Sequence, residues 1–286
     1  MYPYIQIGKY TIASYGLCAM LGFLLGLLLL FFLCRAQKEI SFDDAVYIYT
    51  FAGLGALFGA KIVFLLTVFP AFWKDTVLLI GQCLKTGPEN RAMLMTLWKL
   101  WSASYIFGGL VFYGGLLGAI LTAGMTAKFF GKSLRDFYPV LLPTIPVLAG
   151  MGRIGCFLTG CCYGKETHLP IGILFHHSSV APNGVALFPT QLLEAGFEGV
   201  MACFLVYAFY RKKALSKGLL RNPLYVYLIS YAVFRFFLEF FRGDAVRGML
   251  FGLSTSQWIS LIVIMICLLF IQKDSSVADK SRSNIR

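Results

Sequence analysis

The chain has 286 residues, of which 58% are hydrophobic and only 13% are charged. Soluble domains carry about 25% charged residues, so this composition excludes a soluble fold. The formal net charge is +12. In a membrane protein this excess is expected from Lys and Arg in cytoplasmic loops and from attraction to anionic lipid headgroups. No basic stretch is interleaved with aromatic residues outside the apolar segments, so we expect no nucleic acid as a partner.

Seven apolar segments are long enough to cross the hydrocarbon core of a bilayer, which takes roughly 20 residues of helix. We expect them at about 12–34, 46–70, 104–126, 138–160, 188–210, 223–241 and 250–271. The fourth segment holds three prolines and Arg153, so it should be kinked or partly buried within protein. The first segment is too long for the apolar core of a cleavable signal peptide and should remain as a membrane helix.

These segments predict an all-α integral membrane protein with about seven transmembrane helices. Its membrane domain should cover residues 1–271, followed by a polar, disordered cytoplasmic tail over 272–286. Loops that follow the first, third, fifth and seventh segments are richer in Lys and Arg than the opposite loops, and the basic loop 211–221 contributes most. Because Lys and Arg favour cytoplasmic loops, we expect the N-terminus outside and the C-terminus in the cytoplasm.

Ionisable side chains inside a membrane span are costly, so their positions are informative. In the sixth segment, Tyr231, Arg235, Glu239 and Arg242 fall on one stripe of a helix whose other face is apolar. The stripe should therefore point toward other helices or a water-filled cavity. A structural Arg–Glu pair, with Arg242 reaching the membrane surface from the helix end, would give the same pattern. The length of the stripe favours a ligand site.

The fifth segment places Gln191, Glu194 and Glu198 on one helical face, and one of the glutamates is expected to neutralise an arginine of the sixth segment. Alternatively, these residues lie at the aqueous interface, which suits Gln191 best. The stretch GRIGCFLTGCCYG at 152–164 surrounds Arg153 with small residues. A guanidinium holds a phosphate through two parallel hydrogen bonds, and glycine lets the backbone approach a ligand closely. This stretch is therefore a candidate anion site.

Two tyrosines within apolar segments complete the candidates. Tyr113 precedes Gly114 and Gly115, which leave room for a groove. Tyr15 lies in the first segment, where a lone tyrosine more often packs or marks the membrane interface. Pairs of glycines four residues apart also recur, and they are interpreted as close helix packing except at the last pair, where the groove competes. These pairs are Gly22/Gly26, Gly55/Gly59 and Gly114/Gly118.

Assembled in this way, the chain resembles the bacterial phosphatidylglycerol:prolipoprotein diacylglyceryl transferase family over most of its length. The resemblance rests on five motifs in the family's order. They are Tyr15-Gly16, the Gly-Gly-Leu stretch after Tyr113, Gly-Arg-x-Gly around Arg153, Pro-x-Gln-x-x-Glu from Pro189, and Tyr-x-x-x-Arg-x-x-x-Glu-Phe-x-Arg from Tyr231. It implies an enzyme of the bacterial cytoplasmic (inner) membrane that moves diacylglyceryl from phosphatidylglycerol to the lipobox cysteine thiol of a prolipoprotein. Glycerol phosphate is released, and the site opens to the outer leaflet.

The resemblance also implies roles for individual residues. Arg153 binds the phosphatidylglycerol headgroup, and Arg235 stabilises the departing phosphate, oriented by Glu239 and Tyr231. Tyr113 and Tyr15 complete the catalytic set. The remaining substrate-binding positions implied are Gly114, Gly115, Cys156, Cys161, Gln191, Glu194 and Arg242, with Gly155 and Gly160 making further room.

The chain departs from the family where the thiol would be activated. Tyr113 replaces the usual histidine, and a phenol with a pKa of about 10 is a poor base at neutral pH, so we expect Tyr113 to orient rather than abstract. Cys156 and Thr159 replace two asparagines, Cys161 replaces a glutamate, and Lys61 replaces an arginine. The base that takes the thiol proton stays open.

Several alternatives follow from these departures. A related transferase would use a different acceptor or lipid, and Cys156, Cys161 and Cys162 could form a covalent lipid carrier, a redox group or a soft-metal site. The spacing matches no standard zinc pattern, and adjacent cysteines are awkward ligands of one ion, so no metal or organic cofactor is predicted. The histidines, His168, His176 and His177, are expected to be solvated. Outside the enzyme class, a transporter should show an internal repeat, which the sequence lacks, and a non-catalytic lipid-binding scaffold would keep the arginines.

Overall fold

A computed structural model of the protein describes residues 2–37, 39–85, 90–178, 180–211, 222–243 and 248–283. Most of these residues are helical, which confirms the all-α class. The chain divides into two compact units, one of residues 1–33 and 139–286 and one of residues 34–138. Residues 212–221 of the basic loop, which argued most strongly for the orientation, lie outside the described residues. The orientation therefore stays a prediction.

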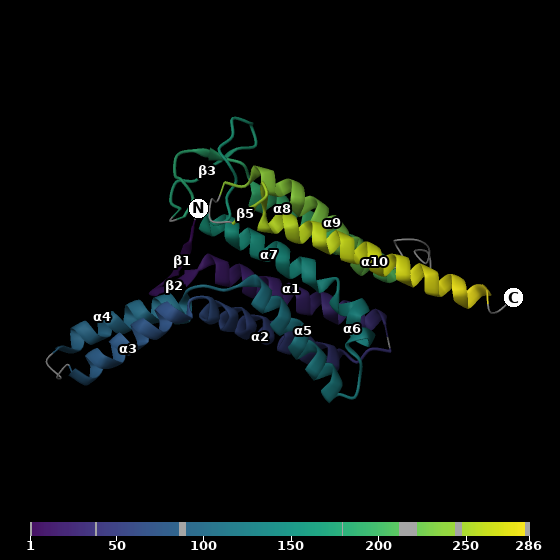
Figure 1. The fold of residues 1–286 in the computed structure, drawn as a ribbon, viewed down its shortest axis with the longest axis horizontal. Coiled ribbons are helices and arrows are strands. Elements are labelled where there is room, and N and C mark those ends of the chain that lie inside the picture. The colour runs from purple at the N-terminus through teal and green to yellow at the C-terminus, as the bar shows by residue number, and fades with distance from the viewer. Residues whose placement is uncertain are drawn as a thin grey trace. The chain divides into compact units, whose positions relative to one another are not determined.

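The first unit is a row of packed helices. It contains α1 (Ser14–Ala36, up to residue 33), α7 (Thr144–Thr159), α8 (Thr190–Tyr210), α9 (Pro223–Leu238) and α10 (Thr255–Ser283). Helix α7 packs on α8, α8 contacts α9, and α9 packs on α10, so α8, α9 and α10 lie side by side (Figure 1). Gly22 of α1 faces α7, where an added Cβ would fall 2.8 Å from the Cβ of Met151. Small residues thus let α1 and α7 approach closely.

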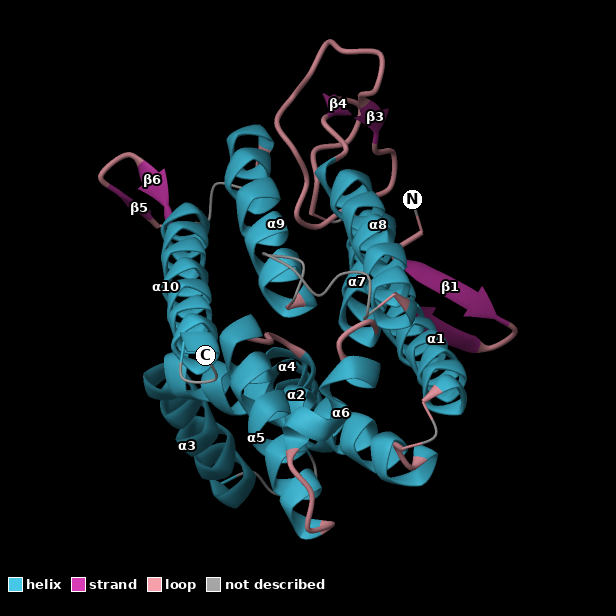
Figure 2. Ribbon diagram, turned by 90° about the vertical axis from the view of Figure 1, so that its right-hand side faces the viewer, coloured by secondary structure: helices cyan, strands magenta, loops and turns pink. Residues whose placement is uncertain are grey.

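Short antiparallel hairpins flank these helices (Figure 2). They pair β1 (Tyr4–Ile7) with β2 (Tyr10–Ala13), β3 (Ile173–Leu174) with β4 (Ala186–Leu187), and β5 (Met249–Leu250) with β6 (Leu253–Ser254). The first precedes α1, the second lies in the loop between α7 and α8, and the third precedes α10. The loop between α7 and α8 has a small core of its own, made by Phe175, Ala181 and Leu187. A core of this kind holds the loop in place beside the ends of both helices.

The second unit is built on a close pair of helices. It contains α2 (Phe42–Thr67), α3 (Phe69–Lys85), α4 (Arg91–Ser102), the π-helical turn η2 (Ala103–Phe107), α5 (Phe112–Phe129) and most of α6 (Leu134–Leu141). Helices α2 and α5 pack along their length. A Cβ added to Gly118 would fall against the carbonyl oxygen of Gly55, and one added to Gly114 against that of Gly59. Both glycine pairs therefore serve packing, including the pair for which a ligand groove was the competing interpretation.

Within the described residues, five helices are long and apolar enough to cross a membrane: α1, α2, α8, α9 with its continuation to Phe241, and α10. Helices α6 and α7 pass the same test only as a pair, and the pair is bent by 53°. They count as a sixth span if the bent pair is taken as one. The predicted kink in the fourth segment is thereby confirmed. The third segment, 104–126, differs: α5 begins only at Phe112, because Gly109 adopts a φ of +55° that interrupts the helix. Seven spans therefore stay a prediction.

Two further segments differ from expectation. The stretch 71–103, between the second and third predicted segments, forms helices α3 and α4, neither of which has a buried residue. Helix α10 continues to Ser283 and thus runs past residue 271, where the polar tail was expected to begin. Residues 284–286 lie outside the described part of the chain. The division of the chain at residue 271 stays a prediction.

We predict that Gly118→Ala lowers the free energy of unfolding by about 1–3 kcal/mol, because a methyl group cannot fit against the α2 backbone. Gly124→Ala is the matched control in the same helix, since an added Cβ there meets nothing within 4 Å. It should be neutral or slightly stabilising. Thermal unfolding in detergent measures both, and equal melting temperatures for the two variants would contradict the packing described.

Candidate active site

A buried carboxylate joins three helices of the first unit. The Nη2 atom of Arg153 on α7 lies 2.9 Å from Oε1 of Glu194 on α8. The hydroxyl of Tyr231 on α9 donates to the same oxygen at 2.9 Å. Glu194 is 1% exposed, so its carboxylate is shielded from water. The predicted partner of a glutamate in this segment was an arginine of the sixth segment, but the structure pairs Glu194 with the arginine of the fourth.

Arg235 on α9 is held by the turn that follows its helix and by α10. Its Nη2 atom lies 2.7 Å from Oε2 of Glu239, four residues on, and donates to Oγ of Ser256 on α10 at 3.4 Å. The other terminal nitrogen, Nη1, is buried and has no hydrogen-bond partner in the part of the chain that the structure describes. Buried donors are almost always paired in native proteins, so this one is available to an acceptor that enters the site.

The two arginines belong to one electrostatic cluster. Tyr231 interacts electrostatically with both Arg153 and Arg235, and Glu194 interacts with Arg235 as well as with Arg153. Glu239 contacts Arg235 as expected, whereas Tyr231 makes its hydrogen bond to Glu194 rather than to Arg235. The polar stripe of the sixth segment thus contributes to two neighbouring ion pairs, Arg153–Glu194 through Tyr231 and Arg235–Glu239 directly.

The end of this stripe leaves the regular helix. Helix α9 ends at Leu238, and Glu239–Phe241 form the 3₁₀ turn η4. Arg242 follows it, is 6% exposed, and forms an isolated β-bridge with Gly164 of the loop after α7. Its guanidinium also hydrogen-bonds to Cys162. Arg242 is therefore buried against the Gly-Arg-x-Gly signature and does not reach outward from the helix end.

The cysteine-rich loop is fixed by its backbone. Helix α7 ends at Gly160, whose φ is +78°, and the amide of Cys161 returns to the carbonyl of Cys156 at 3.1 Å. From the start of α8, the buried side chains of Gln191 and Thr190 donate to the carbonyls of Cys161 and Cys162, both at 2.9 Å. The structure thus gives Gln191 a contact with protein backbone. Its predicted role in substrate binding is untested.

Three thiols meet in this loop. The Sγ atoms of Cys156, Cys161 and Cys162 all lie within 4.8 Å of one another. Hydrogen bonds from the Cys156 and Cys161 thiols, and the guanidinium of Arg242, lower the pKa of the Cys162 thiol below its usual value. The cationic Arg242 therefore favours a thiolate in this cluster.

Tyr15 is also brought to this region. It lies at the start of α1, where a Cβ added to Gly155 of α7 would fall 3.0 Å from its Cδ2 atom. Its phenol interacts electrostatically with Cys156 and Arg153. Gly155 therefore permits the close approach of α1 that places Tyr15 beside the signature.

The remaining predicted site residues lie in the second unit. Tyr113 at the start of α5 is 49% exposed, and its ring contacts Phe112. Gly114 and Gly115 face α2. Lys61 on α2 donates to the carbonyls of Gly108 and Gly109. A role for these residues in binding or catalysis stays a prediction.

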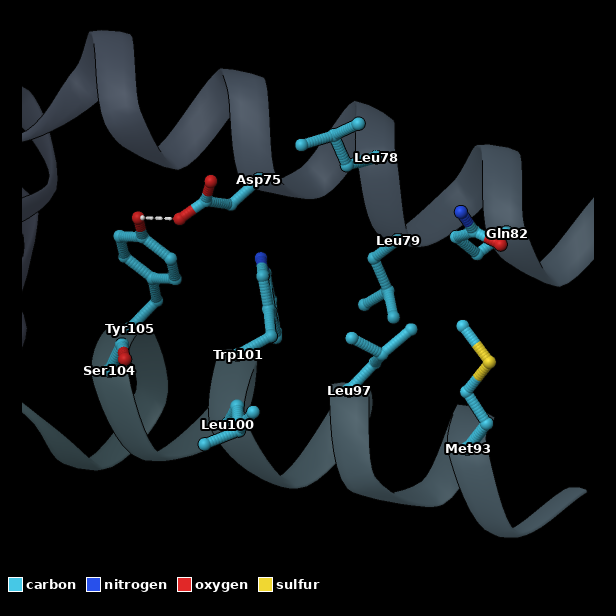
Figure 3. Close-up of a pocket in the computed structure, with 10 residues that line it drawn as sticks. All are labelled: Asp75, Leu78, Leu79, Gln82, Met93, Leu97, Leu100, Trp101, Ser104 and Tyr105. Atoms are coloured by element: carbon cyan, nitrogen blue, oxygen red, sulfur yellow. Dashed lines mark hydrogen bonds between the residues drawn. The ribbon is translucent and has the colours of Figure 1, made fainter.

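The same unit contains a cleft that sequence reasoning missed. It lies between α3 and α4, and Figure 3 shows its apolar walls and the hydrogen bond, 2.7 Å long, that the Tyr105 hydroxyl donates to Asp75. The cleft is lined by Asp75, Leu78, Leu79, Gln82, Met93, Leu97, Leu100, Trp101, Ser104 and Tyr105. The available signal was the amphipathic pattern of 71–103.

Sequence reasoning also missed Thr190 and Ser256 as residues of the site, because the groups that they contact are distant in the sequence.

These features define a class before any comparison is made: a multi-pass helical membrane protein with a buried arginine, Arg235, and a half-buried one, Arg153, among its helices. A family model described as prolipoprotein diacylglyceryl transferase matches residues 3–272, and the chain belongs to this family. The resemblance stated from the motifs is thereby confirmed.

Curated relatives share most of this length. The chain is 32% identical over 256 residues to a phosphatidylglycerol–prolipoprotein diacylglyceryl transferase of Clostridium tetani, covering 89% of this chain and 90% of the relative. It is 32% identical over 262 residues to a second enzyme of that name from Clostridium perfringens, covering 91% and 90%. It is 30% identical over 268 residues to the protein of the same name from Nitrosomonas europaea, covering 91% of this chain and 84% of the relative.

We predict that Glu194→Gln lowers the free energy of unfolding by about 2–3 kcal/mol, because Arg153 keeps its charge and loses its carboxylate. The matched control is Glu198→Gln, one turn along α8. Glu198 accepts a hydrogen bond from the neutral Tyr227 hydroxyl at 3.0 Å, and an amide oxygen can replace it. Thermal unfolding in detergent compares the two, and a larger loss for Glu198→Gln would show that the described ion pair is not the stabilising element.

Proposed function

We propose that the protein transfers the diacylglyceryl group of phosphatidylglycerol to the lipobox cysteine thiol of a prolipoprotein and releases glycerol phosphate. The reaction takes place at the outer face of a bacterial cytoplasmic membrane. One observation carries the proposal: a chain of this family buries Arg235, next to the Arg153–Glu194 pair, with an N–H group that has no partner among the described residues. Two guanidinium groups in one cluster fit a substrate whose headgroup is an anionic phosphate.

Arg153 is proposed to hold the phosphatidylglycerol headgroup. Its side chain is 26% exposed, and one terminal nitrogen is bound to Glu194. A guanidinium has five N–H donors, so others remain for the two parallel hydrogen bonds that phosphate accepts. Glu194 fixes the group in place, and Tyr231 fixes Glu194. Tyr231 is therefore proposed to position Arg153 through Glu194.

Arg235 is proposed to stabilise the phosphate as it leaves. Glu239 and Ser256 hold one of its terminal nitrogens, and the other, Nη1, which has no acceptor within the described part of the chain, donates to the developing charge. A donor that is already fixed in a dry site stabilises a transition state without reorganisation. Burial at 7% exposure strengthens this interaction further.

The chemistry is an S-alkylation. The acceptor sulfur forms a bond to the glyceryl carbon, the bond from that carbon to the phosphate oxygen breaks, and glycerol phosphate leaves with the electron pair. The acceptor thiol must lose its proton. Tyr113 is proposed to orient the substrates, since a phenol is a poor base at neutral pH.

We predict that Arg153→Lys and Arg235→Lys each lower kcat/KM for transfer by about 100- to 1000-fold, because lysine keeps the charge and loses the bidentate geometry. The purified protein in detergent is incubated with phosphatidylglycerol and a lipobox peptide. Mass spectrometry then detects the diacylglyceryl group on the peptide cysteine. Arg211→Lys, at an exposed position just after α8, is the control and should retain activity.

The outcomes separate the alternatives. Release of glycerol phosphate without a modified peptide would show that the assigned acceptor is wrong, while the assigned lipid substrate would stand. Tight phosphatidylglycerol binding by folded protein with no turnover would favour a non-catalytic scaffold. If both arginine variants were as active as the unchanged protein, the roles assigned to Arg153 and Arg235 would be wrong.

A further inference from the structure

The thiol cluster has a geometry that neither the headgroup site nor the leaving-group site uses. The Sγ atoms of Cys156, Cys161 and Cys162 lie mutually within 4.8 Å, and all three cysteines are free. A disulfide would join two of them and leave the third. A metal ion would use all three. Zinc–sulfur bonds of about 2.3 Å place the sulfurs of a tetrahedral site about 3.8 Å apart, so the cluster needs to contract by about 1 Å or less.

The backbone removes the objection that adjacent cysteines are awkward ligands. Cys162 has a φ of +59°, a conformation that costs free energy for a residue with a side chain. In an extended chain neighbouring side chains point to opposite sides, whereas this left-handed turn brings the Cys161 and Cys162 thiols together. The turn is held at two consecutive carbonyls by the start of α8, with Thr190 donating to that of Cys162 and Gln191 to that of Cys161.

Charge and access also suit a divalent ion. Three thiolates and one divalent cation leave a net charge of −1, and the guanidinium of Arg242 lies in hydrogen-bond contact with Cys162 to balance it. Cys156 is buried, while Cys161 and Cys162 are partly exposed, so the cluster can be reached from outside. The three histidines are exposed and do not belong to the cluster. The donor set is thus sulfur from three cysteines, which selects a soft d¹⁰ cation of the zinc class.

We propose that Cys156, Cys161 and Cys162 bind one divalent cation of the zinc class, and that the acceptor thiol of the substrate protein occupies its fourth coordination position. The second half of this proposal rests on the proposed function. Zinc sites with three protein ligands leave the fourth position to water or substrate, and a thiol that coordinates the ion is deprotonated.

The step balances without another reactant. The acceptor thiol binds the cation as a thiolate, and its proton passes to solvent. The thiolate sulfur then forms the bond to the glyceryl carbon while the carbon–oxygen bond to phosphate breaks. The product is a neutral thioether, a weaker ligand that can leave the ion. This chemistry supplies the thiol activation that Tyr113 cannot.

The metal site is tested without turnover. The full-length protein is purified in detergent, reduced, stripped with a chelator and titrated with Cd²⁺, which gives an ultraviolet thiolate-to-metal charge-transfer band. We expect one ion per chain. Cys156→Ser, Cys161→Ser and Cys162→Ser should each weaken binding by at least about 100-fold, since even outer contacts of metal sites contribute 10- to 100-fold. Cys203→Ser and Cys267→Ser, in α8 and α10, are the controls and should bind normally.

A second measurement on the unchanged protein guards against variants that do not fold. Bound Zn²⁺ should protect Cys156, Cys161 and Cys162 from alkylation, as mapped by mass spectrometry, and leave the exposed Cys83 reactive. Binding of no ion, or equal alkylation with and without Zn²⁺, would overturn the metal site.

The acceptor position is tested with a lipobox peptide. Addition of the cysteine peptide to the Cd²⁺-loaded protein should intensify the charge-transfer band, and the same peptide with serine should not. An unchanged band would overturn this half of the proposal and leave the metal site standing. Full transfer activity in the chelator-stripped protein would also overturn it, while supporting the proposed function. A peptide-dependent band with no transfer would count against the proposed function alone.

Discussion

The site depends on one carboxylate oxygen that serves three helices. A charge buried among apolar helices is stable only with a partner, and Glu194 supplies it to Arg153 while accepting a hydrogen bond from Tyr231. Because these groups come from α7, α8 and α9, a shift of any one helix would break a buried interaction. The requirement that charge be paired thus fixes the relative positions of the helices that carry the site.

The two arginines differ in how completely they are satisfied. Arg153 is balanced by Glu194, a residue on another helix, and a quarter of its side chain is exposed. Arg235 is paired with Glu239 in the turn that follows its helix, and it keeps a buried nitrogen without a partner among the described residues. The first arrangement suits a group that binds ligand and remains stable without it. The second holds an N–H donor in place without an acceptor among the described residues, and such a donor stabilises charge that develops during a reaction.

The sequence predicted what depends on local period and composition, and failed where contacts are distant. The helical spacing of Arg235 and Glu239 allowed a structural ion pair as the alternative to a ligand site, and the structure shows that the two side chains are paired. The partner of Glu194 could not be predicted, because Arg153 lies 41 residues away by number and packing of α7 on α8 decides the contact. The motifs marked the cysteines, but the sequence does not reveal the positive φ of Cys162. Helices α3 and α4 were missed for a different reason: their apolar faces are not continuous enough to resemble membrane spans.

Helix α8 connects the arginine site to the cysteine loop. Its first two residues, Thr190 and Gln191, hold the carbonyls of Cys162 and Cys161, and Glu194 one turn later holds Arg153. A single rigid element therefore sets the position of the loop that carries the thiols and of the guanidinium next to them. Side chains of the loop, such as the three cysteines, can be exchanged without moving Arg153, because the loop is held through its backbone. Under the proposed function, this separation lets a chain keep the charges proposed to bind phosphate while the side chains proposed to face the acceptor change.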